Sequence, residues 1–399
     1  MVGKDFSEQE GFRTAAIHTG HTPKSLGDPV IPPIVNSTIY RYDAIHNDKD
    51  FEYTRVGNPT RTALEQCLAT LDDGKYALTF SSGQGATTSI THLMSPHDHI
   101  LVSRDLYTGT EGLMSSLGAQ KRVDVEFFNA VDLEELKRLL KPSTRMVWLE
   151  SPTNPHLVVV DIRAISDIAH NYNKNIIVVV DNSFLSSYFQ RPLNFGADIS
   201  MYSLTKFMNG HSDVLMGAAV TNCQDIYERL KRVQVGLGIV PSPFDCFLMH
   251  RSLKTLGVRM EKHHENSLAV AKFLQKHPKI EKVLHPALPD NPRYSLTLRQ
   301  TYGHSGIMAF YLRGGIDEVK KFASKLKYIT IAKSLGGVES TIVFPHIMMY
   351  ERFSEEEKIN MGISVNFARM SIGIEDHNVL INDLDQALNS LPASPVSKL

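Results

Sequence analysis

The sequence predicts an α/β fold: a doubly wound, mostly parallel sheet with a smaller C-terminal α+β domain. Short apolar runs alternate with amphipathic stretches over about half of the chain, which is typical of repeated βα units. The strongest run, residues 176–180, is apolar at every position, as in a parallel strand covered on both faces. With 399 residues and 42% hydrophobic side chains, the chain can bury more than one core.

The predicted elements begin with an irregular arm, residues 1–57, in which two consecutive prolines force extended backbone. A helix follows, because Asn58 can cap it, Pro59 suits its first position, and leucines recur at helical spacing until Gly74. Strands are predicted at residues 76–80, 99–103, 123–128, 146–149, 176–180, 199–202 and 215–220. Helices are predicted at 133–140 and from 162 onward, each after an aspartate that can cap it.

Prolines at 241 and 243 then punctuate the chain, and one long helix is predicted over residues 246–276. A strand at 307–312 and a closing helix at 379–391 indicate a second, smaller domain. The predicted organisation is an N-terminal arm (1–57), a large α/β domain (58–259) and a C-terminal α+β domain (260–399).

The charge balance excludes several classes of protein. Lysine and arginine total 42 against 43 acidic residues, a net charge of −1, so no nucleic acid or anionic membrane surface is expected as a partner. No apolar run reaches the ~18 residues of a membrane span. The three cysteines are far apart and the histidines form no metal-binding set, so we expect no metal and a reducing, cytoplasmic location. The adjacent His263 and His264 are expected to be solvated. The final Ser397-Lys398-Leu399 keeps a peroxisomal address open as an alternative.

Chemistry is expected after the strands, where open parallel sheets bind their ligands. Gly83 and Gln84 lie in a run of small residues after the strand at 76–80; such a run lets backbone N–H groups approach an anion, or only makes a tight turn. Asp181 ends the apolar strand, and a buried carboxylate needs either a cationic partner or an internal hydrogen bond.

Two further groups follow strands. Lys206 comes after Ser203 and Thr205; a desolvated lysine there attacks an aldehyde while the hydroxyls hold a phosphate, although most lysines are only solvated surface residues. The segment Glu150-Ser151-Pro152-Thr153-Asn154-Pro155 is fixed by two prolines, and either presents Asn154 to a ligand or is a rigid turn.

In combination, the four groups match what pyridoxal phosphate (PLP) requires. This cofactor has a phosphate, a ring nitrogen that a carboxylate keeps protonated, and an aldehyde that forms a Schiff base with lysine. Tyr107 is in a position to stack on the ring. A dinucleotide-dependent dehydrogenase is excluded, because no G-x-G-x-x-G fingerprint is present.

The sequence resembles the Cys/Met-metabolism, or trans-sulfuration, enzymes of PLP fold type I, the aspartate aminotransferase-like fold, from about residue 17 to residue 391. The resemblance rests on Tyr53-Thr54-Arg55-Val56-Gly57-Asn58-Pro59-Thr60, on residues 150–155, on Val180-Asp181-Asn182-Ser183-Phe184, on residues 197–206 and on Ser334-Leu335-Gly336-Gly337-Val338-Glu339-Ser340.

This resemblance implies a role for each matched residue. Lys206, Tyr107 and Asp181 are the implied catalytic residues: the lysine carries the cofactor, the tyrosine stacks on it and the aspartate binds its ring nitrogen. The implied phosphate ligands are Gly83, Gln84, Ser203 and Thr205, with Tyr53 and Arg55 reaching the cofactor of a neighbouring subunit. The implied substrate ligands are Asn154, Ser334, Glu339, Arg369 and Tyr53.

The activity implied by the resemblance is γ-elimination from cystathionine, which yields cysteine, 2-oxobutanoate and ammonia, with hydrogen sulfide from cysteine or homocysteine. The implied assembly is a homotetramer built as a dimer of dimers. Gly112 stands where such lyases carry an arginine, and Met349-Tyr350 replaces a Thr-His pair, whereas Glu339 matches the γ-lyase pattern. A methionine or homocysteine γ-lyase, a cystathionine β-lyase, a γ-synthase and a non-catalytic binding protein therefore stay open as alternatives.

Overall fold

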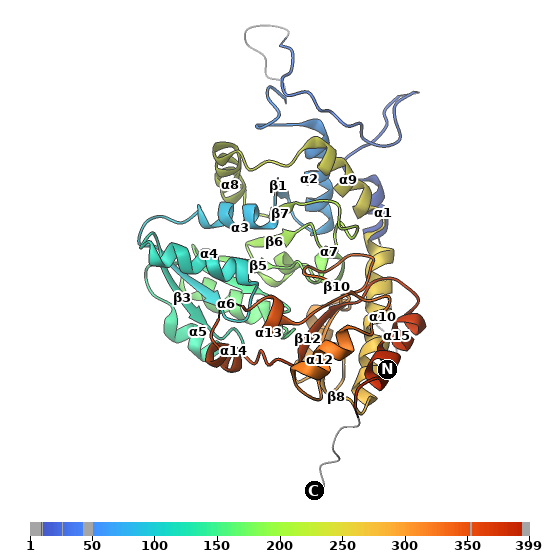
Figure 1. Cartoon of the computed structure of the whole chain (residues 1–399). Coiled ribbons are helices and arrows are strands. Elements are labelled where there is room, and N and C mark those ends of the chain that lie inside the picture. The colour runs from blue at the N-terminus through green and yellow to red at the C-terminus, as the bar shows by residue number, and fades with distance from the viewer. Residues whose placement is uncertain (1–8, 10, 26, 43–50, 352, 393–399) are drawn as a thin grey trace. The chain divides into compact units, whose positions relative to one another are not determined.

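The computed structural model describes residues 9, 11–25, 27–42, 51–351 and 353–392. They separate into two compact units (Figure 1). The larger unit takes the chain up to Ser151 and residues Val160–Gly257, and the smaller unit takes Pro152–Val159 and the chain from Val258 onward. The short segment Pro152–Val159 thus belongs with the C-terminal part of the chain, which contiguous boundaries drawn from the sequence do not anticipate.

The larger unit is built on a seven-stranded, mostly parallel sheet. Its strands, in spatial order, are β1 (Tyr76–Phe80), β7 (Gly217–Thr221), β6 (Ile199–Ser203), β5 (Ile177–Asp181), β4 (Thr144–Glu150), β2 (His99–Ser103) and β3 (Asp124–Phe128). The five from β6 to β3 run parallel, and only β7 runs antiparallel to its neighbours. The predicted strands are confirmed, with bounds displaced by at most two residues.

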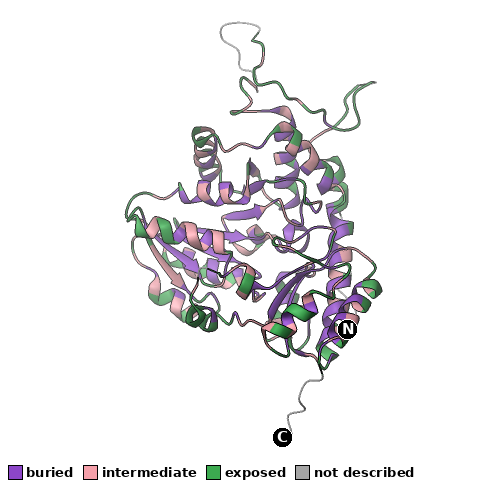
Figure 2. Ribbon diagram, in the orientation of Figure 1, coloured by how far each residue is buried: buried purple, intermediate pink, exposed green. Residues whose placement is uncertain are grey.

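Successive residues of the central strands face opposite sides of the sheet, and both sets are apolar. Helices therefore cover both faces. On β5, Val178 and Val180 join one core with Ile162 and Ile165, whereas Val179 joins another core with Trp148. Figure 2 shows the central strands buried, and β5 is buried at every residue. The helices of this unit are α1 (Phe12–His18), α2 (Pro59–Leu71), α3 (Gly83–Thr91), α4 (Thr108–Ala119), α5 (Leu133–Leu139), α6 (Ile162–Tyr172), α7 (Ser186–Phe189), η2 (Pro192–Phe195), α8 (Gln224–Leu237) and α9 (Pro243–Leu253). This arrangement confirms the doubly wound fold.

The caps that the sequence predicts are present. Asn58 Oδ1 accepts hydrogen bonds from the N–H groups of Thr60 and Arg61 at 3.0 and 3.2 Å. Asp132 and Asp161 cap α5 and α6 in the same manner. Each cap satisfies N–H groups that a helix start leaves without intrahelical partners.

The single long helix predicted over residues 246–276 is wrong. The chain forms α9 and then α10 (Leu256–Lys276). The N–H and the hydroxyl of Thr255 both donate to the carbonyl of Ser252, at 3.2 Å each, and this turn ends α9. Leucines and lysines continue through the break, so hydrophobic periodicity alone does not reveal it.

The smaller unit contains a five-stranded, mostly antiparallel sheet. Its spatial order is β10 (Thr330–Ile331), β11 (Thr341–Val343), β12 (Phe367–Ser371), β9 (Ile307–Leu312) and β8 (Ile280–Leu284), with β10 and β11 parallel. Its helices are most of α10, then α11 (Tyr294–Gln300), α12 (Ile316–Ala323), α13 (Pro345–Met348), α14 (Glu355–Asn360) and α15 (His377–Asn389). One core joins α10, α12 and α15 to the sheet through residues such as Leu274, Phe322 and Leu384. This is the predicted α+β architecture.

His263 contradicts the sequence prediction of a solvated pair. Its side chain is fully buried, and Nδ1 donates to the carbonyl of Ile372 at 2.7 Å. His264 is only partly exposed. His263 faces the end of β12 through this bond, whereas His264 contacts the backbone of His304. The sequence did not reveal this burial, because histidine is also common on surfaces.

In the described part of the chain, no helix is long and apolar enough to cross a membrane, and no group of three or more metal-ligating side chains comes together. The C-terminal Ser397-Lys398-Leu399 lies outside the described residues.

Candidate active site

A carboxylate and a lysine lie at adjacent strand ends of the larger unit. Asp181 is the last residue of β5, and Lys206 is in the turn that follows the neighbouring β6. Asp181 is 8% exposed and accepts a hydrogen bond from the N–H of Ser183 at 3.0 Å. Burial raises the pKa of Asp181, while Ser183 and the charge of Lys206 pull it back. The edge therefore holds a desolvated acid within electrostatic reach of the lysine.

The internal hydrogen bond that the sequence left open for Asp181 is present, through Ser183. It does not offset the burial, because the pKa stays above its ordinary value. A cationic group beside the carboxylate would remove that penalty. Asp181 therefore fits a positively charged ring nitrogen.

The start of α3 forms a cradle beside the end of β6. Ser82 Oγ accepts a hydrogen bond from the N–H of Gly85 at 2.9 Å and caps the helix. A Cβ on Gly83 would lie 3.0 Å from Cβ and Oγ of Ser203, so only glycine brings the two segments this close. Backbone N–H groups at such a helix start favour a phosphate.

The turn that carries Lys206 is fixed by backbone hydrogen bonds. The Lys206 N–H donates to the Ser203 carbonyl at 3.1 Å, and the Gly210 N–H donates to the Lys206 carbonyl at 2.8 Å. Thr205 Oγ1 accepts from the Met216 N–H at 3.0 Å, which joins the turn to β7. The lysine side chain is half-buried. These hydrogen bonds fix the backbone from which the Lys206 side chain projects.

Tyr107 lies at the N-terminus of α4, and its side chain is 44% exposed. Its backbone N–H donates to Glu150 Oε2 at 2.8 Å. Gln84, from the first turn of α3, donates to the carbonyl of Gly109 at 3.0 Å. Tyr107 and Gln84 thus both contact the start of α4 and its neighbours, and Glu150, for which the sequence predicts no role, is the partner of the Tyr107 backbone.

A buried polar network underlies Asp181 and was missed from the sequence. Asn182 Nδ2 donates to the carbonyl of Gln190 at 2.7 Å and to the hydroxyl of Tyr202 at 3.0 Å. The Tyr202 hydroxyl in turn donates to Asp72 Oδ1 at 2.5 Å, and burial raises the pKa of Asp72 to about 7. Gln190 also reaches the carbonyl of Ser151 at 2.9 Å. The position of Asn182 directly after Asp181 was the one sequence feature that pointed here.

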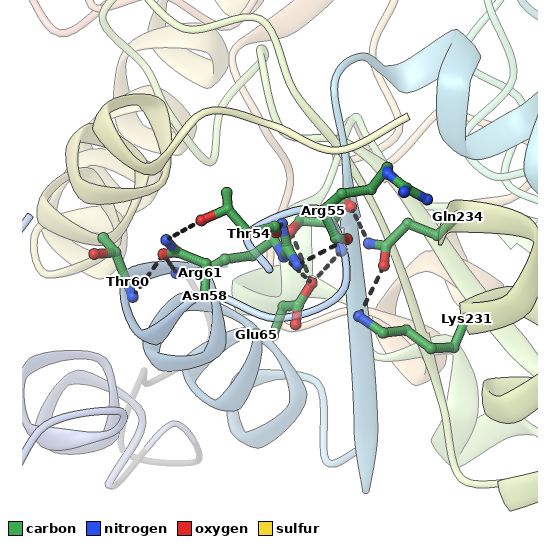
Figure 3. A network of polar contacts seen from close by, with 9 residues as sticks. Thr54, Arg55, Asn58, Thr60, Arg61, Glu65, Lys231 and Gln234 are labelled. Atoms are coloured by element: carbon green, nitrogen blue, oxygen red, sulfur yellow. Dashed lines mark hydrogen bonds and ion pairs between the residues drawn. The ribbon is translucent and has the colours of Figure 1, made fainter. Parts of the chain in front are cut away.

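Tyr53 and Arg55 belong to a separate group beside α2 and α8. The buried Arg61 guanidinium donates to the carbonyls of Thr54 and Arg55 at 2.8 and 3.3 Å (Figure 3). The Arg55 side chain lies over the Tyr53 ring, 5.5 Å from its centroid, and donates to the carbonyl of Val235 at 3.0 Å. The two predicted phosphate ligands are therefore exposed side chains on a firmly held segment.

Figure 3 also shows how this segment is tied to β1. Glu65 Oε1 accepts from the N–H and the hydroxyl of Thr79, both at 2.9 Å. Gln234 of α8 donates to the carbonyl of the same Thr79 at 2.6 Å, and Lys231 donates to Gln234 at 3.0 Å. Because β1 leads directly into Ser82 and Gly83, one network holds both predicted phosphate-binding segments.

In the smaller unit, Arg369 of β12 gathers the other predicted ligands. The arginine is 3% exposed, and it donates to Asn154 Oδ1 at 2.7 Å and to the Ser334 carbonyl at 3.2 Å. Ser334 has a left-handed backbone, with φ of 88°. Glu339 is exposed in the same loop. A buried guanidinium fork with an amide beside it suits a carboxylate.

The fold and these side chains define a PLP-dependent α/β enzyme: a desolvated acid for the ring nitrogen, a helix start for the phosphate and a lysine beside both. Comparison with known proteins gives the family. The sequence model of the Cys/Met metabolism PLP-dependent enzymes matches residues 13–389, and the chain belongs to this family. The predicted resemblance, enzyme class and cofactor are thereby confirmed.

Individual relatives cover nearly the whole chain. Cystathionine gamma-lyase from Homo sapiens is 44% identical over 397 residues, 98% of each chain. Putative cystathionine gamma-lyase 2 from Caenorhabditis elegans is 46% identical, over 94% of this chain and 97% of its own length. The crystal structure of metB from Corynebacterium glutamicum superposes with a TM-score of 0.91 at 39% identity, over 97% of this chain and 100% of that one.

Proposed function

We propose that this enzyme cleaves the Cγ–S bond of L-cystathionine and releases cysteine, 2-oxobutanoate and ammonia. Two kinds of observation support the proposal. Relatives that are named cystathionine gamma-lyase are 43–46% identical over at least 94% of the chain. The observation that carries the chemistry is the desolvated Asp181 at the end of β5, within electrostatic reach of Lys206.

The larger unit supplies the groups that bind the cofactor. Bound PLP provides an electron-withdrawing ring that stabilises negative charge at the substrate Cα. Asp181 would hold the proton on the ring nitrogen, and Tyr107 would cover the ring face. The start of α3 would hold the phosphate through Gly83 and Gln84, with the hydroxyls of Ser203 and Thr205 beside it. Lys206 Nζ would bind the cofactor until the substrate amine replaces it.

Lys206 then moves protons. The released Nζ would take the proton from the substrate Cα, pass it to the cofactor, and then take a proton from Cβ. The electron pair of that C–H bond would form a Cβ–Cγ double bond as the Cγ–S bond breaks, and Nζ would return the proton to the departing sulfur, so that cysteine leaves as the thiol. Water then releases the remaining four-carbon unit as 2-oxobutanoate and ammonia.

The smaller unit supplies the groups that recognise the substrate. Arg369 and Asn154, joined at 2.7 Å, would bind the substrate α-carboxylate together with Ser334. Glu339 would attract the distal ammonium group of cystathionine. A bidentate guanidinium fixes the orientation of a carboxylate as well as its position.

The active form is proposed to be a homotetramer, a dimer of dimers in which Tyr53 and Arg55 reach the phosphate of a neighbouring subunit. Both side chains are exposed. The arm before them also exposes apolar side chains, with Val30 84% and Ile39 69% exposed. A second copy of the chain is the partner that would cover them. We place the enzyme in the cytoplasm, with a peroxisome as the alternative that Ser397-Lys398-Leu399 offers.

Gly112 on α4 favours a second candidate, a γ-lyase of methionine or homocysteine. It offers no side chain to a distal carboxylate, and such substrates have none. A β-lyase or a γ-synthase would use the same cofactor groups with different products. Release of hydrogen sulfide from cysteine or homocysteine is a proposed side activity of the same groups.

Product analysis decides between these candidates. The PLP-loaded enzyme is given cystathionine, methionine, homocysteine and cysteine separately, and 2-oxobutanoate, pyruvate and thiol are quantified. The highest kcat/KM for cystathionine, with equal amounts of cysteine and 2-oxobutanoate, supports the proposal. Strong turnover of homocysteine or methionine beside weak turnover of cystathionine supports the second candidate. Loss of the visible absorbance of lysine-bound cofactor in Lys206→Ala checks the lysine, and turnover by that variant at the wild-type rate overturns the mechanism.

A further inference from the structure

Glu150 is a buried carboxylate to which the mechanism above gives no role. It ends β4, is 4% exposed, and is the register partner of Asp181 on the neighbouring strand. A buried carboxylate costs several kcal/mol unless hydrogen bonds compensate it. The bond at 2.8 Å from the backbone N–H of Tyr107 to Glu150 Oε2 is such a compensation. Glu150 thus binds the backbone of Tyr107, the residue proposed to cover the cofactor.

Four further contacts fix the Tyr107 turn. Tyr107 is the N-cap of α4, and its carbonyl accepts from the N–H groups of Thr110 and Glu111 at 3.0 and 3.1 Å. Gly109 lies against the ring, since a Cβ there would stand 2.4 Å from Tyr107 Cε1. Gln84 holds the Gly109 carbonyl at 3.0 Å.

Tyr107 is 44% exposed, so packing against Gly109 covers only part of its side chain. Its direction depends on the backbone from which it projects, and Glu150 fixes that backbone at its first atom. A carboxylate is also a favourable partner at the start of a 12-residue helix, where the helix dipole is positive.

We propose that Glu150 is the positioning residue of Tyr107: it sets the angle at which the ring lies on the cofactor. The inference rests on the proposed role of Tyr107 and adds a residue that acts through it. Removing the carboxylate while keeping Tyr107 should therefore weaken the stacking without removing any group that touches the cofactor.

The test compares Glu150→Ala, Glu150→Gln, Tyr107→Ala and the double variant Glu150→Ala/Tyr107→Ala, without turnover. The readouts are the dissociation constant of PLP and the visible circular dichroism of bound PLP, which reports how rigidly the ring is held. Glu150→Ala should weaken PLP binding roughly 10- to 100-fold, the effect of losing one hydrogen bond to a charged group, and should reduce the dichroism. Glu150→Gln keeps an acceptor oxygen and should stay within about threefold of wild type.

The double variant separates positioning from a general structural effect. If Glu150 acts through Tyr107, adding Glu150→Ala to Tyr107→Ala changes PLP binding less than about twofold. Additive losses overturn the proposal, and so does an unchanged dichroism in Glu150→Ala. Asp383→Asn is the matched control: Asp383 is 3% exposed and accepts the N–H groups of Lys327 and Tyr328 at 3.0 and 2.9 Å in the smaller unit. It should lower the unfolding temperature and leave the dichroism unchanged.

A second variant keeps the test decisive if Glu150→Ala does not fold. Glu150→Asp keeps the charge but shortens the side chain by one methylene group, which withdraws the carboxylate from the Tyr107 N–H, so the dichroism should fall. An unchanged dichroism in Glu150→Asp overturns the proposal. Failure of the proposed function looks different, because a wild-type enzyme that binds PLP but leaves cystathionine intact refutes the substrate while the coupling of Glu150 to Tyr107 persists.

Discussion

The two units differ in the buried groups whose pKa shifts: among the described residues, both carboxyl groups whose pKa burial raises lie in the larger unit, whereas four of the six buried histidines lie in the smaller unit. In the larger unit, burial raises the pKa of Asp72 to about 7 and also raises that of Asp181. In the smaller unit, burial lowers the pKa of His263 to about 4 and that of His304 to about 3, and that of His285 also falls well below its usual range. Desolvation disfavours the charged form in every case, so the acids stay protonated more readily and the histidines stay neutral.

This difference distinguishes a carboxyl group proposed to bind a ligand from histidines that serve as core residues. Asp181 stands at a strand end, where the proposed cofactor would compensate it with a positively charged ring nitrogen. The histidines of the smaller unit are compensated from within: His304 Nε2 donates to the carbonyl of Ile307 at 2.9 Å, and its ring packs edge-on against His285 at 4.7 Å. A neutral, hydrogen-bonded imidazole is stable in a protein core. A buried carboxyl group with a raised pKa in a candidate site indicates instead that a positively charged ligand binds beside it.

Acid should therefore destabilise the smaller unit. A group whose pKa is lower in the folded than in the unfolded state binds fewer protons when folded, so stability falls as the pH drops below the ordinary histidine value. For His263 and His304 together the loss is about 4 kcal/mol at about pH 5. Asp72 shifts in the opposite sense and gains stability over the same range. Hydrogen exchange at about pH 7.5 and about pH 5 should show α10 and β9 opening before β4 and β5.

The matched variants of this prediction are His304→Gln and His18→Gln. Glutamine keeps a donor for the Ile307 carbonyl but does not titrate, so His304→Gln should flatten the pH dependence of the smaller unit. His18 is exposed on α1, and its replacement should leave that dependence unchanged. Equal acid sensitivity of both units would contradict the comparison.

Replacing Asp181 should lower the activity of the enzyme and raise the stability of its cofactor-free form. Asp181→Asn keeps an acceptor for the Ser183 N–H but removes the charge, and kcat should fall about 100- to 1,000-fold, as for other lost electrostatic contacts to a reacting system. Because the folded pKa of Asp181 is raised, the charged form opposes folding above that pKa, and its stability contribution is lost as the pH rises. The cofactor-free Asn variant should therefore unfold at a higher temperature than wild type at about pH 8. A drop in both properties would make Asp181 a structural residue.

How much of this follows from sequence depends on the region. Three of the proposed cofactor ligands, Gly83, Asp181 and Lys206, could be proposed from the sequence, because each lies at the end of an apolar strand or within three residues after it, and parallel strands bring their ends to one edge. The helix cap at Asn58 and the fully apolar strand at residues 176–180 are also local patterns, which the sequence shows directly. Lys206, Asp181 and Gly83 came from strand ends alone.

The proposed substrate ligands of the smaller unit could not be predicted from local patterns. Arg369, Asn154 and Ser334 are far apart in the chain, and only the resemblance to a family indicates that they act together. The burial of His263 depends on which face of α10 meets the sheet. The bond from Tyr107 to Glu150 depends on backbone geometry, which leaves no mark on the sequence. Contacts made through the backbone or through tertiary packing are the ones that sequence patterns miss.

The third prediction tests the guanidinium of the smaller unit. Arg369→Lys keeps the charge but loses the fork that reaches Asn154 and the Ser334 carbonyl together. We expect KM for cystathionine to rise about 10- to 100-fold with a smaller change in kcat, as for the loss of a charge-assisted hydrogen bond. PLP affinity should be unchanged, because every proposed cofactor ligand belongs to the larger unit. Weaker PLP binding in this variant would contradict the division of roles between the units.

The smallest effect is expected at Ser340, which holds the loop that carries Ser334. Ser340 is fully buried; its hydroxyl donates to Glu375 Oε2 at 2.9 Å and accepts from the Gly373 N–H at 2.8 Å. Its N–H donates to Glu375 Oε1 at 2.6 Å. Ser340→Ala removes the hydroxyl but keeps the backbone bond, so the loop stays attached at one point.

We expect KM to rise about fivefold in Ser340→Ala, the effect of about 1 kcal/mol, with kcat and PLP affinity unchanged. Ser324→Ala, which removes an exposed hydroxyl at the end of α12, is the control and should match wild type. The comparison becomes sharper if Glu375→Gln, which retains an acceptor for the Ser340 N–H, has an effect no larger than Ser340→Ala. If kcat falls while KM stays constant, the loop takes part in the chemical step rather than in substrate binding.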